Sequence, residues 1–270
     1  MAAPTTARPS GPQRIRTRKK ELPFPLNLYQ TAVGKKWVMA VTGLMLIGFV
    51  LGHMFGNLKL YIGPVAENGV WEYDLDVYAE FLRELLVPLF PRTWFLWLIR
   101  FGLIAAFALH IHAAYSLTFL NQKANKSYSS KRDWQAANWA SRTTRYTGTV
   151  ILFYLIFHLA DLTWGVLSDD WKRGHVQENV VNSLSNPLVA AIYAVATIAL
   201  AIHLFHGVRS MFQTLGWNNP RFALIRQGLQ YGIAAVVLVG NLSFPLAVVT
   251  GLVDADADCI GQSTETTECN

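Results

Sequence analysis

The sequence has few charged residues and almost no cysteine. Only 15% of its 270 residues are charged, whereas soluble domains carry roughly a quarter. The hydrophobic share is 52%, and the mean hydropathy is positive. This composition excludes an intrinsically disordered chain, a collagen-like fibre and a disulfide-rich scaffold, and it indicates a membrane protein. Both cysteines, Cys259 and Cys269, lie in the last dozen residues, so the hydrophobic body contains no CxxC motif.

Five apolar runs are long enough to cross a bilayer core of about 30 Å, which takes about 20 helical residues. They cover residues 37–58, 93–120, 146–167, 187–208 and 227–253. The first run starts too late and is too long for a cleavable signal peptide. We therefore expect an all-α membrane protein, with a basic segment at 1–36, a bundle of five transmembrane helices at 37–253 and an acidic tail at 254–270.

The charges are distributed unevenly between the two sides that five crossings define. Residues 1–36, 121–145 and 209–226 contain 17 of the 23 Lys and Arg residues, and the opposite side contains 14 of the 17 acidic residues. Because basic flanks stay in the cytoplasm, this asymmetry predicts a cytoplasmic N-terminus and an extracytoplasmic C-terminus. The net charge of +6 is therefore no sign of nucleic-acid binding.

Two segments outside the runs have a pattern of their own. Residues 14–20 are strongly basic, which suits docking of an acidic protein or of anionic membrane lipid, or simply a charge cluster that sets topology. Residues 74–87 have apolar side chains at helical spacing and acids on the other face. They predict an amphipathic helix on the outer membrane surface, between the first two spans.

Histidines are unusually frequent inside the apolar runs. Six of the seven lie there, namely His53, His110, His112, His158, His203 and His206. Ionisable groups in hydrocarbon are costly and usually face the bundle interior, where they pair or bind something. Six such residues on four different helices favour ligation of a cofactor over simple packing.

The depth of each histidine predicts two pairs. At 1.5 Å per residue, His53 and His158 lie deep, about 16 and 12 residues from the cytoplasmic ends of their helices. His112 and His206 lie nearer the cytoplasmic ends, roughly 8 and 2 residues in. Two facing imidazoles are the axial ligands that a six-coordinate haem iron needs. The pairs His53 with His158 and His112 with His206 therefore predict two haems and electron transfer through the membrane.

Two histidines are left over from this pairing. Positions two apart on a helix point about 200° apart, so His110 and His112 cannot face one cofactor. We interpret His110 as a packing residue or a residue near the haem propionates. His203 shares a helix face with His206, which leaves three alternatives: a contact to a propionate, a contact to a quinone carbonyl, or ligation in place of His206.

Four stretches resemble a known family. They are GHMF at 52–55, LHIHAAY at 109–115, TGTVILFYLIFH at 147–158 and LFHGVRSMFQTLGW at 204–217. They are similar to the cytochrome b membrane-anchor subunit of succinate dehydrogenase and fumarate reductase, in its single-chain five-helix type, over about residues 28–253. The resemblance implies a multi-pass subunit of respiratory complex II in a bacterial plasma membrane, surrounded by lipid. The subunit would not be catalytic alone and would bind a flavoprotein and an iron–sulfur subunit. The resemblance also allows a higher oligomer of the whole complex.

The resemblance also implies cofactors. In di-haem members, helices two and four hold the proximal haem, and helices one and three hold the distal haem. Carried over, His112 and His206 would be proximal and His53 and His158 distal, each pair binding one haem b; some members have fewer haems. The alternative is a Rieske-type [2Fe-2S] cluster, which needs two thiolates. Cys259 and Cys269 are the only cysteines, and nine residues separate them, which more simply predicts a disulfide that fixes the tail.

Further polar residues are candidates for supporting roles. Arg100 and Asp161 are expected to pair with each other, or to lie near a distal haem propionate. A quinone needs hydrogen-bond donors in an apolar cleft. On the cytoplasmic side the candidates are Ser141, Arg145, His203 and Trp217, and on the outer side they are Asp161 and Trp164.

The expected function is electron transfer between the iron–sulfur subunit and a membrane quinone. The same histidines would also suit a stand-alone transmembrane di-haem cytochrome with no dehydrogenase partner. A transporter with a histidine proton relay is a third class, but no inverted repeat supports it.

Overall fold

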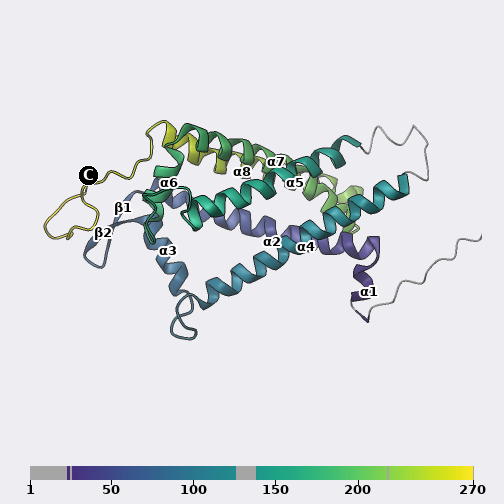
Figure 1. Cartoon of the computed structure of the whole chain (residues 1–270), viewed down its shortest axis with the longest axis horizontal. Coiled ribbons are helices and arrows are strands. Elements are labelled where there is room, and N and C mark those ends of the chain that lie inside the picture. The colour runs from purple at the N-terminus through teal and green to yellow at the C-terminus, as the bar shows by residue number, and fades with distance from the viewer. Residues whose placement is uncertain (1–22, 25, 126–137, 218, 270) are drawn as a thin grey trace, which may run out of the picture.

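The computed structural model describes residues 23–24, 26–125, 138–217 and 219–269, so the basic stretch at 14–20 lies outside the described residues. Within them, five helices are long and apolar enough to cross a membrane. These are α2 (Ala32–Asn57), α4 (Trp94–Asn125), α5 (Asn138–His158), α7 (Pro187–Thr214) and α8 (Ala223–Val249). The predicted five-helix bundle is therefore confirmed (Figure 1).

Local chemistry determines where these helices begin and end. Thr31 caps α2 by accepting the backbone N–H of Gly34, and Asn186 caps α7 just before Pro187, which suits a first helical position. α5 ends at His158, before the end of the predicted span, because a π-helical turn (η2, Leu159–Thr163) follows it. That turn ends the third span a few residues before the predicted boundary at 167.

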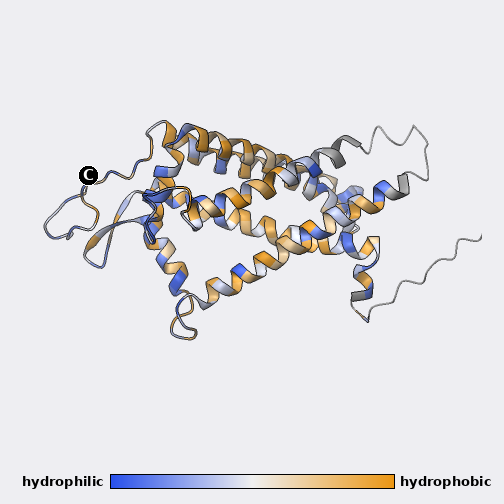
Figure 2. Ribbon diagram, viewed as in Figure 1, coloured by the Kyte–Doolittle hydropathy of each residue, from blue (hydrophilic) through white to orange (hydrophobic). Residues whose placement is uncertain are grey.

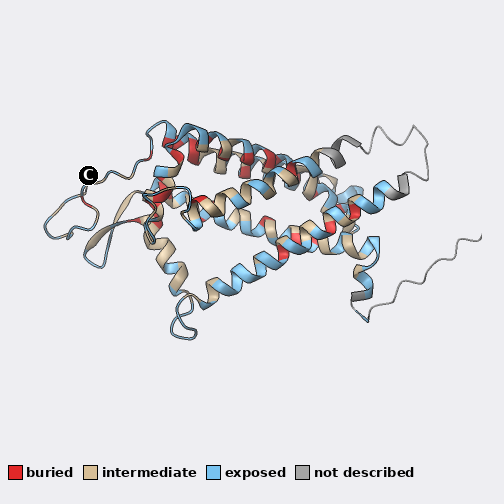
Figure 3. Cartoon of the chain, in the orientation of Figure 1, coloured by how far each residue is buried: buried red, intermediate tan, exposed pale blue. Residues whose placement is uncertain are grey.

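The spans pack as neighbouring pairs around a core of small and aliphatic side chains. α2 packs on α4, α5 on α7, and α7 on α8, while α2 also touches α7 and α8. One half of α4 diverges from the rest of the bundle (Figure 1). The outward faces are both apolar and exposed (Figures 2 and 3). This arrangement is that of a multi-pass membrane protein, whose outer surface faces lipid.

Short elements gather at one end of the bundle, and we call them the polar cap. They are η1 (Leu58–Tyr61), β1 (Pro64–Glu67), β2 (Val70–Tyr73), α3 (Asp74–Glu84), α6 (Val176–Leu184) and the tail from residue 254 to 269. β1 and β2 form an antiparallel hairpin, and α3 is the amphipathic helix that the sequence predicts at 74–87. α1 (Leu26–Tyr29) and η3 (Pro220–Phe222) lie toward the opposite end.

The C-terminal tail is tied to the hairpin. The backbone N–H of Gly261 donates to the carbonyl of Trp71 at 2.9 Å, and that of Trp71 donates to the carbonyl of Gln262 at 3.1 Å. The indole of Trp71 donates to the carbonyl of Thr267. Cys259 and Cys269 are joined in a disulfide within this tail. The cap is thus closed by contacts between parts of the chain that lie far apart in sequence.

Candidate functional site: paired histidines

Two pairs of imidazole rings face each other inside the bundle. His53 of α2 and His158 of α5 have ring centroids 6.1 Å apart, with their planes at 77°. His110 of α4 and His203 of α7 have centroids 6.4 Å apart, with their planes at 64°. We call them the cap-side pair and the far pair. Each pair joins two different helices, so the bundle itself sets the separation of the rings.

The structure brings together one of the two histidine pairs expected from depth and replaces the other. His53 faces His158, but His110 faces His203, and His112 and His206 are not brought together. The Nδ1 atom of His112 lies 2.5 Å from the hydroxyl of Tyr29. His206 lines a groove of about 360 Å³ between α5, α7 and α8.

Helix rotation explains this difference. Ala106, Ala113 and Leu117 form the buried stripe of α4, and His110 falls on the same stripe at spacings of three and four. His112, two positions further on, therefore points away from the bundle. His110 and His112 have nearly the same depth along the membrane normal, so depth does not distinguish them. The direction of the buried small-residue stripe of α4 does.

The cap-side pair is held by a buried polar chain. The hydroxyl of Tyr193 donates to a carboxylate oxygen of Asp161 at 2.8 Å, so its oxygen accepts from Nδ1 of His158 at 3.2 Å. This leaves Nε2 of His158 without a proton. Nδ1 of His53 lies 3.0 Å from the side-chain amide nitrogen of Asn57, an N–H donor. Both rings thus have a partner on Nδ1.

The far pair has partners on Nδ1 as well. Nδ1 of His110 lies 3.2 Å from the hydroxyl of Thr42. Nδ1 of His203 donates to the backbone carbonyl of Thr144 at 3.1 Å. A ring nitrogen engaged in this way fixes the tautomer and leaves Nε2 available, which is how proteins prepare imidazole as a metal ligand.

A comparison with protein families decides which family this is. Residues 120–242 match the family model of the succinate dehydrogenase/fumarate reductase transmembrane subunit. This match supports the identification of the chain as a membrane-anchor subunit of that family. No curated protein and no solved structure matches it significantly. The matched range contains His158, His203 and the helices that carry them, which is one ring of each facing pair.

The expected ion pair between Arg100 and Asp161 is not formed in this transmembrane subunit. Asp161 is buried and accepts from the hydroxyls of Ser183 at 2.6 Å and Tyr193 at 2.8 Å. The guanidinium of Arg100 instead lies over the ring of Trp97, 5.0 Å from its centroid. Arg100 is exposed on α4, whereas the buried carboxylate of Asp161 has its donors on α6 and α7.

The candidate quinone contacts lie in several places. Arg145 is exposed near the start of α5, and Trp217 follows α7 and packs its ring on Phe212 with centroids 5.8 Å apart. His203 belongs to the far pair, one carboxylate oxygen of Asp161 accepts from both Ser183 and Tyr193, and Trp164 is exposed beyond α5. The side chain of Ser141 lies outside the described residues.

Two residues of the transmembrane subunit that contact the far pair were missed by the sequence analysis. Thr42 and Thr147 are buried hydroxyls that lie within 3.2 Å and 3.4 Å of Nδ1 of His110 and His203. A sequence signal for them exists. A Thr-Gly pair precedes a histidine by the same spacing in both α2 and α5, at Thr42-Gly43 and Thr147-Gly148.

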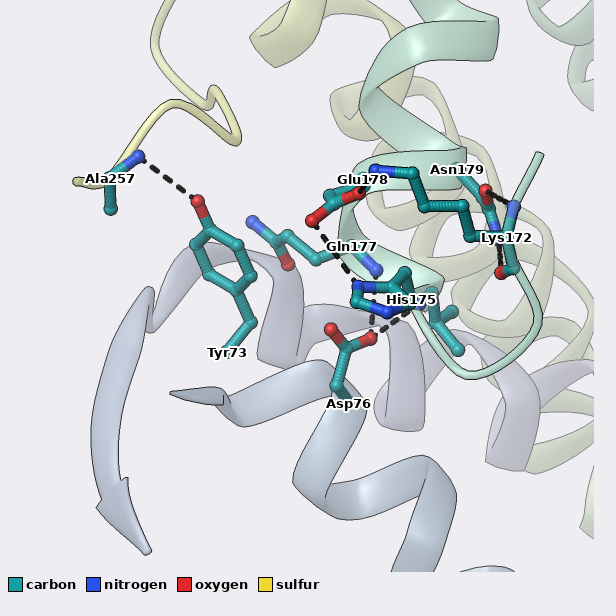
Figure 4. Close-up of polar contacts among 9 residues, drawn as sticks. Tyr73, Asp76, Lys172, His175, Gln177, Glu178, Asn179 and Ala257 are labelled. Atoms are coloured by element: carbon teal, nitrogen blue, oxygen red, sulfur yellow. Dashed lines mark hydrogen bonds and ion pairs between the residues drawn. The ribbon is translucent and has the colours of Figure 1, made fainter. Parts of the chain in front are cut away.

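The polar cap holds a second network, away from the histidine pairs (Figure 4). A carboxylate oxygen of Asp76 accepts from the backbone N–H groups of Val176 at 2.5 Å and Gln177 at 3.0 Å, so α3 caps the N-terminus of α6. Glu178 accepts from Lys172 at 3.2 Å and lies 3.3 Å from Nδ1 of His175. Desolvation raises the pKa of the Asp76 carboxyl, against the opposing effect of the two backbone donors.

Proposed function

We propose that this subunit transfers electrons between an iron–sulfur subunit and a membrane quinone, by way of two haem b groups. The cap-side pair, His53 and His158, would hold one haem. The far pair, His110 and His203, would hold the other, in place of the expected His112 and His206. In this proposal the subunit lies in a bacterial plasma membrane, and the end opposite the polar cap faces the cytoplasm. The iron–sulfur and flavoprotein subunits would bind at that cytoplasmic end.

The separation of the facing rings is the observation that carries this proposal. An imidazole nitrogen binds a metal ion at about 2 Å, so a metal between two imidazoles sets their ring centres roughly 6 Å apart. The observed separations are 6.1 and 6.4 Å. His53 with His158, and His110 with His203, would therefore each hold one haem iron between their rings.

The donor set favours haem over an iron–sulfur cluster. A Rieske-type cluster needs two thiolates beside two imidazoles. In the described part of the chain the cysteines are joined in a disulfide in the tail, and no group of three or more His, Cys, Asp and Glu side chains could hold a metal. Two nitrogen ligands on opposite sides suit a macrocycle that supplies the other four.

The residues of this chain would do three things for electron transfer. The helices hold each imidazole against its partner, the apolar bundle excludes water, and the Nδ1 contacts of His158 and His203 keep their Nε2 atoms free of a proton. Haem with two histidine ligands supplies reversible one-electron transfer and leaves no coordination position for a substrate. Succinate or fumarate chemistry would therefore take place in the partner subunits.

The assignment of ligands is tested by single alanine substitutions in the purified complex. We expect two haems per subunit in the wild type and one in His53→Ala, His158→Ala, His110→Ala and His203→Ala, from reduced-minus-oxidised spectra and haem quantification. His112→Ala and His206→Ala are the matched controls and should keep two. Loss of a haem from His112→Ala or His206→Ala, with both kept in His110→Ala and His203→Ala, would contradict the ligand assignment.

Membership of an enzyme complex is tested by copurification. Because the family is a subunit of succinate dehydrogenase or fumarate reductase, we expect a flavoprotein and an iron–sulfur protein to copurify with a tagged chain in mild detergent. Recovery of the chain with its haems but with no flavoprotein would instead support a stand-alone cytochrome.

A further inference from the structure

α2 and α5 carry the same short sequence pattern. Thr42-Gly43 precedes His53 in α2, and Thr147-Gly148 precedes His158 in α5, with the histidine eleven positions after the threonine in both helices. The two histidines of the pattern form the cap-side pair. The two Thr-Gly sites lie nearer the N-terminal ends of the same helices, and each is beside one ring of the far pair. The helix pairs α2–α4 and α5–α7 thus carry matched Thr-Gly and histidine positions.

The hydroxyl contacts at the two sites are matched. Thr42 donates its hydroxyl hydrogen to the carbonyl of Val38 at 2.6 Å, and Thr147 donates to the carbonyl of Thr143 at 2.8 Å. A hydroxyl has one hydrogen, so each oxygen can only accept from the imidazole beside it. Nδ1 of His110 lies 3.2 Å from Thr42, and Nδ1 of His203 lies 3.4 Å from Thr147.

A backbone carbonyl assists each hydroxyl. The Met39 carbonyl, three residues before Thr42, lies 3.3 Å from the Thr42 hydroxyl oxygen that contacts His110. The Thr144 carbonyl, three residues before Thr147, accepts from Nδ1 of His203 at 3.1 Å. Both rings of the far pair therefore have a proton on Nδ1, which His110 donates to a threonine oxygen and His203 shares between a threonine oxygen and a carbonyl. The lone pair of each Nε2 is then left for a metal.

The glycines provide the space for these rings. A Cβ atom at Gly43 would lie 3.3 Å from Cε1 of His110, and one at Gly148 would lie 3.1 Å from Cε1 of His203. These distances are shorter than ordinary carbon–carbon contacts of 3.5–4.0 Å, so a larger residue would move the ring. Gly48, by contrast, has no such neighbour within 4 Å.

We propose that Thr42-Gly43 and Thr147-Gly148 are two ring seats, in which the threonine orients and polarises the imidazole and the glycine admits it. The seats are positioning elements that act through His110 and His203. The inference rests on the proposed function, because it assumes that these two histidines hold a haem. A hydrogen bond to Nδ1–H makes the ring a stronger donor to the metal, and such outer contacts tune metal sites.

Substitution of the threonines tests the electronic part of the proposal. An imidazole that is a stronger donor to iron stabilises ferric over ferrous iron. Thr42→Val and Thr147→Val remove the hydroxyl that strengthens the imidazole, so they should shift the ferric–ferrous equilibrium toward ferrous iron by up to about tenfold. This corresponds to a rise in the midpoint potential of the far haem of up to about 59 mV for one electron. The carbonyls that remain should prevent complete loss of the haem. Redox titration of the purified complex, with EPR of the ferric low-spin haems, measures both effects.

Matched variants distinguish positioning from general stability. Thr42→Ser and Thr147→Ser keep the acceptor oxygen and should restore the wild-type potential. Thr118→Val is the control, because the Thr118 hydroxyl donates to the Ala114 carbonyl on α4 without contacting a seat. Gly43→Ala and Gly148→Ala should weaken haem binding at the far pair by 10-fold or more, while Gly48→Ala should not. The signals of the cap-side haem should be unchanged in all of these variants.

The outcomes separate this inference from the proposed function. A wild-type complex without low-spin haem would contradict both. A wild-type complex with two haems, whose potentials and EPR signals are the same in the valine variants, would overturn the ring seats alone. Failure of the serine variants to restore the potential would overturn them as well, because the effect would then not depend on the acceptor oxygen.

Discussion

Asp161 illustrates how single polar residues are accommodated in this bundle. Within the five spans, all of which are described, it is the only acidic residue. It is 5% exposed and accepts hydroxyl hydrogens from Ser183 and Tyr193. The Tyr193 oxygen in turn accepts from His158. One tyrosine therefore satisfies a buried carboxylate and a buried imidazole together, and removing its hydroxyl should affect both.

Tyr193→Phe is expected to destabilise the subunit by about 1–3 kcal/mol, because Asp161 loses one of two donors and His158 loses its acceptor. Thermal unfolding of the purified complex measures the change. Tyr231→Phe is the matched control, since Tyr231 is 62% exposed on the lipid-facing side of α8. Equal unfolding temperatures for the two variants would show that the polar chain contributes nothing to stability.

The histidine pairs show what the sequence could and could not predict about the site. Depth along a helix follows from counting residues, and it correctly placed His53 near His158. Rotation about the helix axis depends on which face packs against a neighbour, and counting does not contain that information. The small residues Ala106 and Ala113, spaced around His110, were the available signal for α4. The matched Thr-Gly pairs were a second signal, visible only when two distant helices are compared.

At the scale of elements, α6 depends on a partner from another part of the chain. It has nine residues, too few to be stable alone, and its own N-cap, His175, makes no capping bond with its side chain. Asp76 of α3 supplies that cap from 100 residues away. The helix is therefore stable only when α3 is in place. This contact joins the segment between α2 and α4, which contains α3, to the segment between α5 and α7, which contains α6.

Asp76 variants test this dependence through pH. Desolvation raises the pKa of Asp76, so the folded cap binds a proton more strongly than the unfolded chain. The cap should therefore gain stability as the pH falls through that raised pKa, toward the usual value of about 4. Asp76→Asn keeps the acceptor oxygen, so it should stay within about 1 kcal/mol of wild type at pH 7 and lose this pH dependence. Asp76→Ala should cost about 1–2 kcal/mol.

Hydrogen–deuterium exchange of the α6 amides at pH 5 and pH 7, corrected for intrinsic rates, measures these effects. His175 and Glu178 also face Asp76, so His175→Gln is the control for a contribution from the histidine. The same pH dependence in Asp76→Asn as in the wild type would assign it to another group.

The sequence predicted the spanning helices better than the cap. A span is recognisable from about 20 consecutive residues, because hydrocarbon excludes charges locally. The hairpin β1–β2 has strands of four residues each, and its third neighbour is the tail, paired through Trp71 and Gly261. Pairing between segments so far apart leaves no periodic signal in either one. The amphipathic helix α3 was predictable because its pattern, unlike that of the hairpin, is local.

At the scale of the whole molecule, the two ends of the bundle differ in chemistry. The polar cap contains most of the acidic residues and the disulfide between Cys259 and Cys269. The segments that join the spans at the other end are basic. Basic loops stay in the cytoplasm, and disulfides persist in oxidising compartments. The two arguments are independent, and both predict that the cap faces the outside, as the proposed docking of the partner subunits at the opposite end requires.

Labelling of the native cysteines tests this orientation directly. In intact spheroplasts, we expect a membrane-impermeant maleimide to label Cys259 and Cys269 after mild reduction and to leave them unlabelled without it. A variant with Cys259→Ser, Cys269→Ser and Asn219→Cys places a single thiol in the loop between α7 and α8, and it should react only after lysis. The reverse pattern would put the cap in the cytoplasm. The partner subunits would then have to bind beside the cap-side pair, so the order of the two haems along the electron path would be inverted.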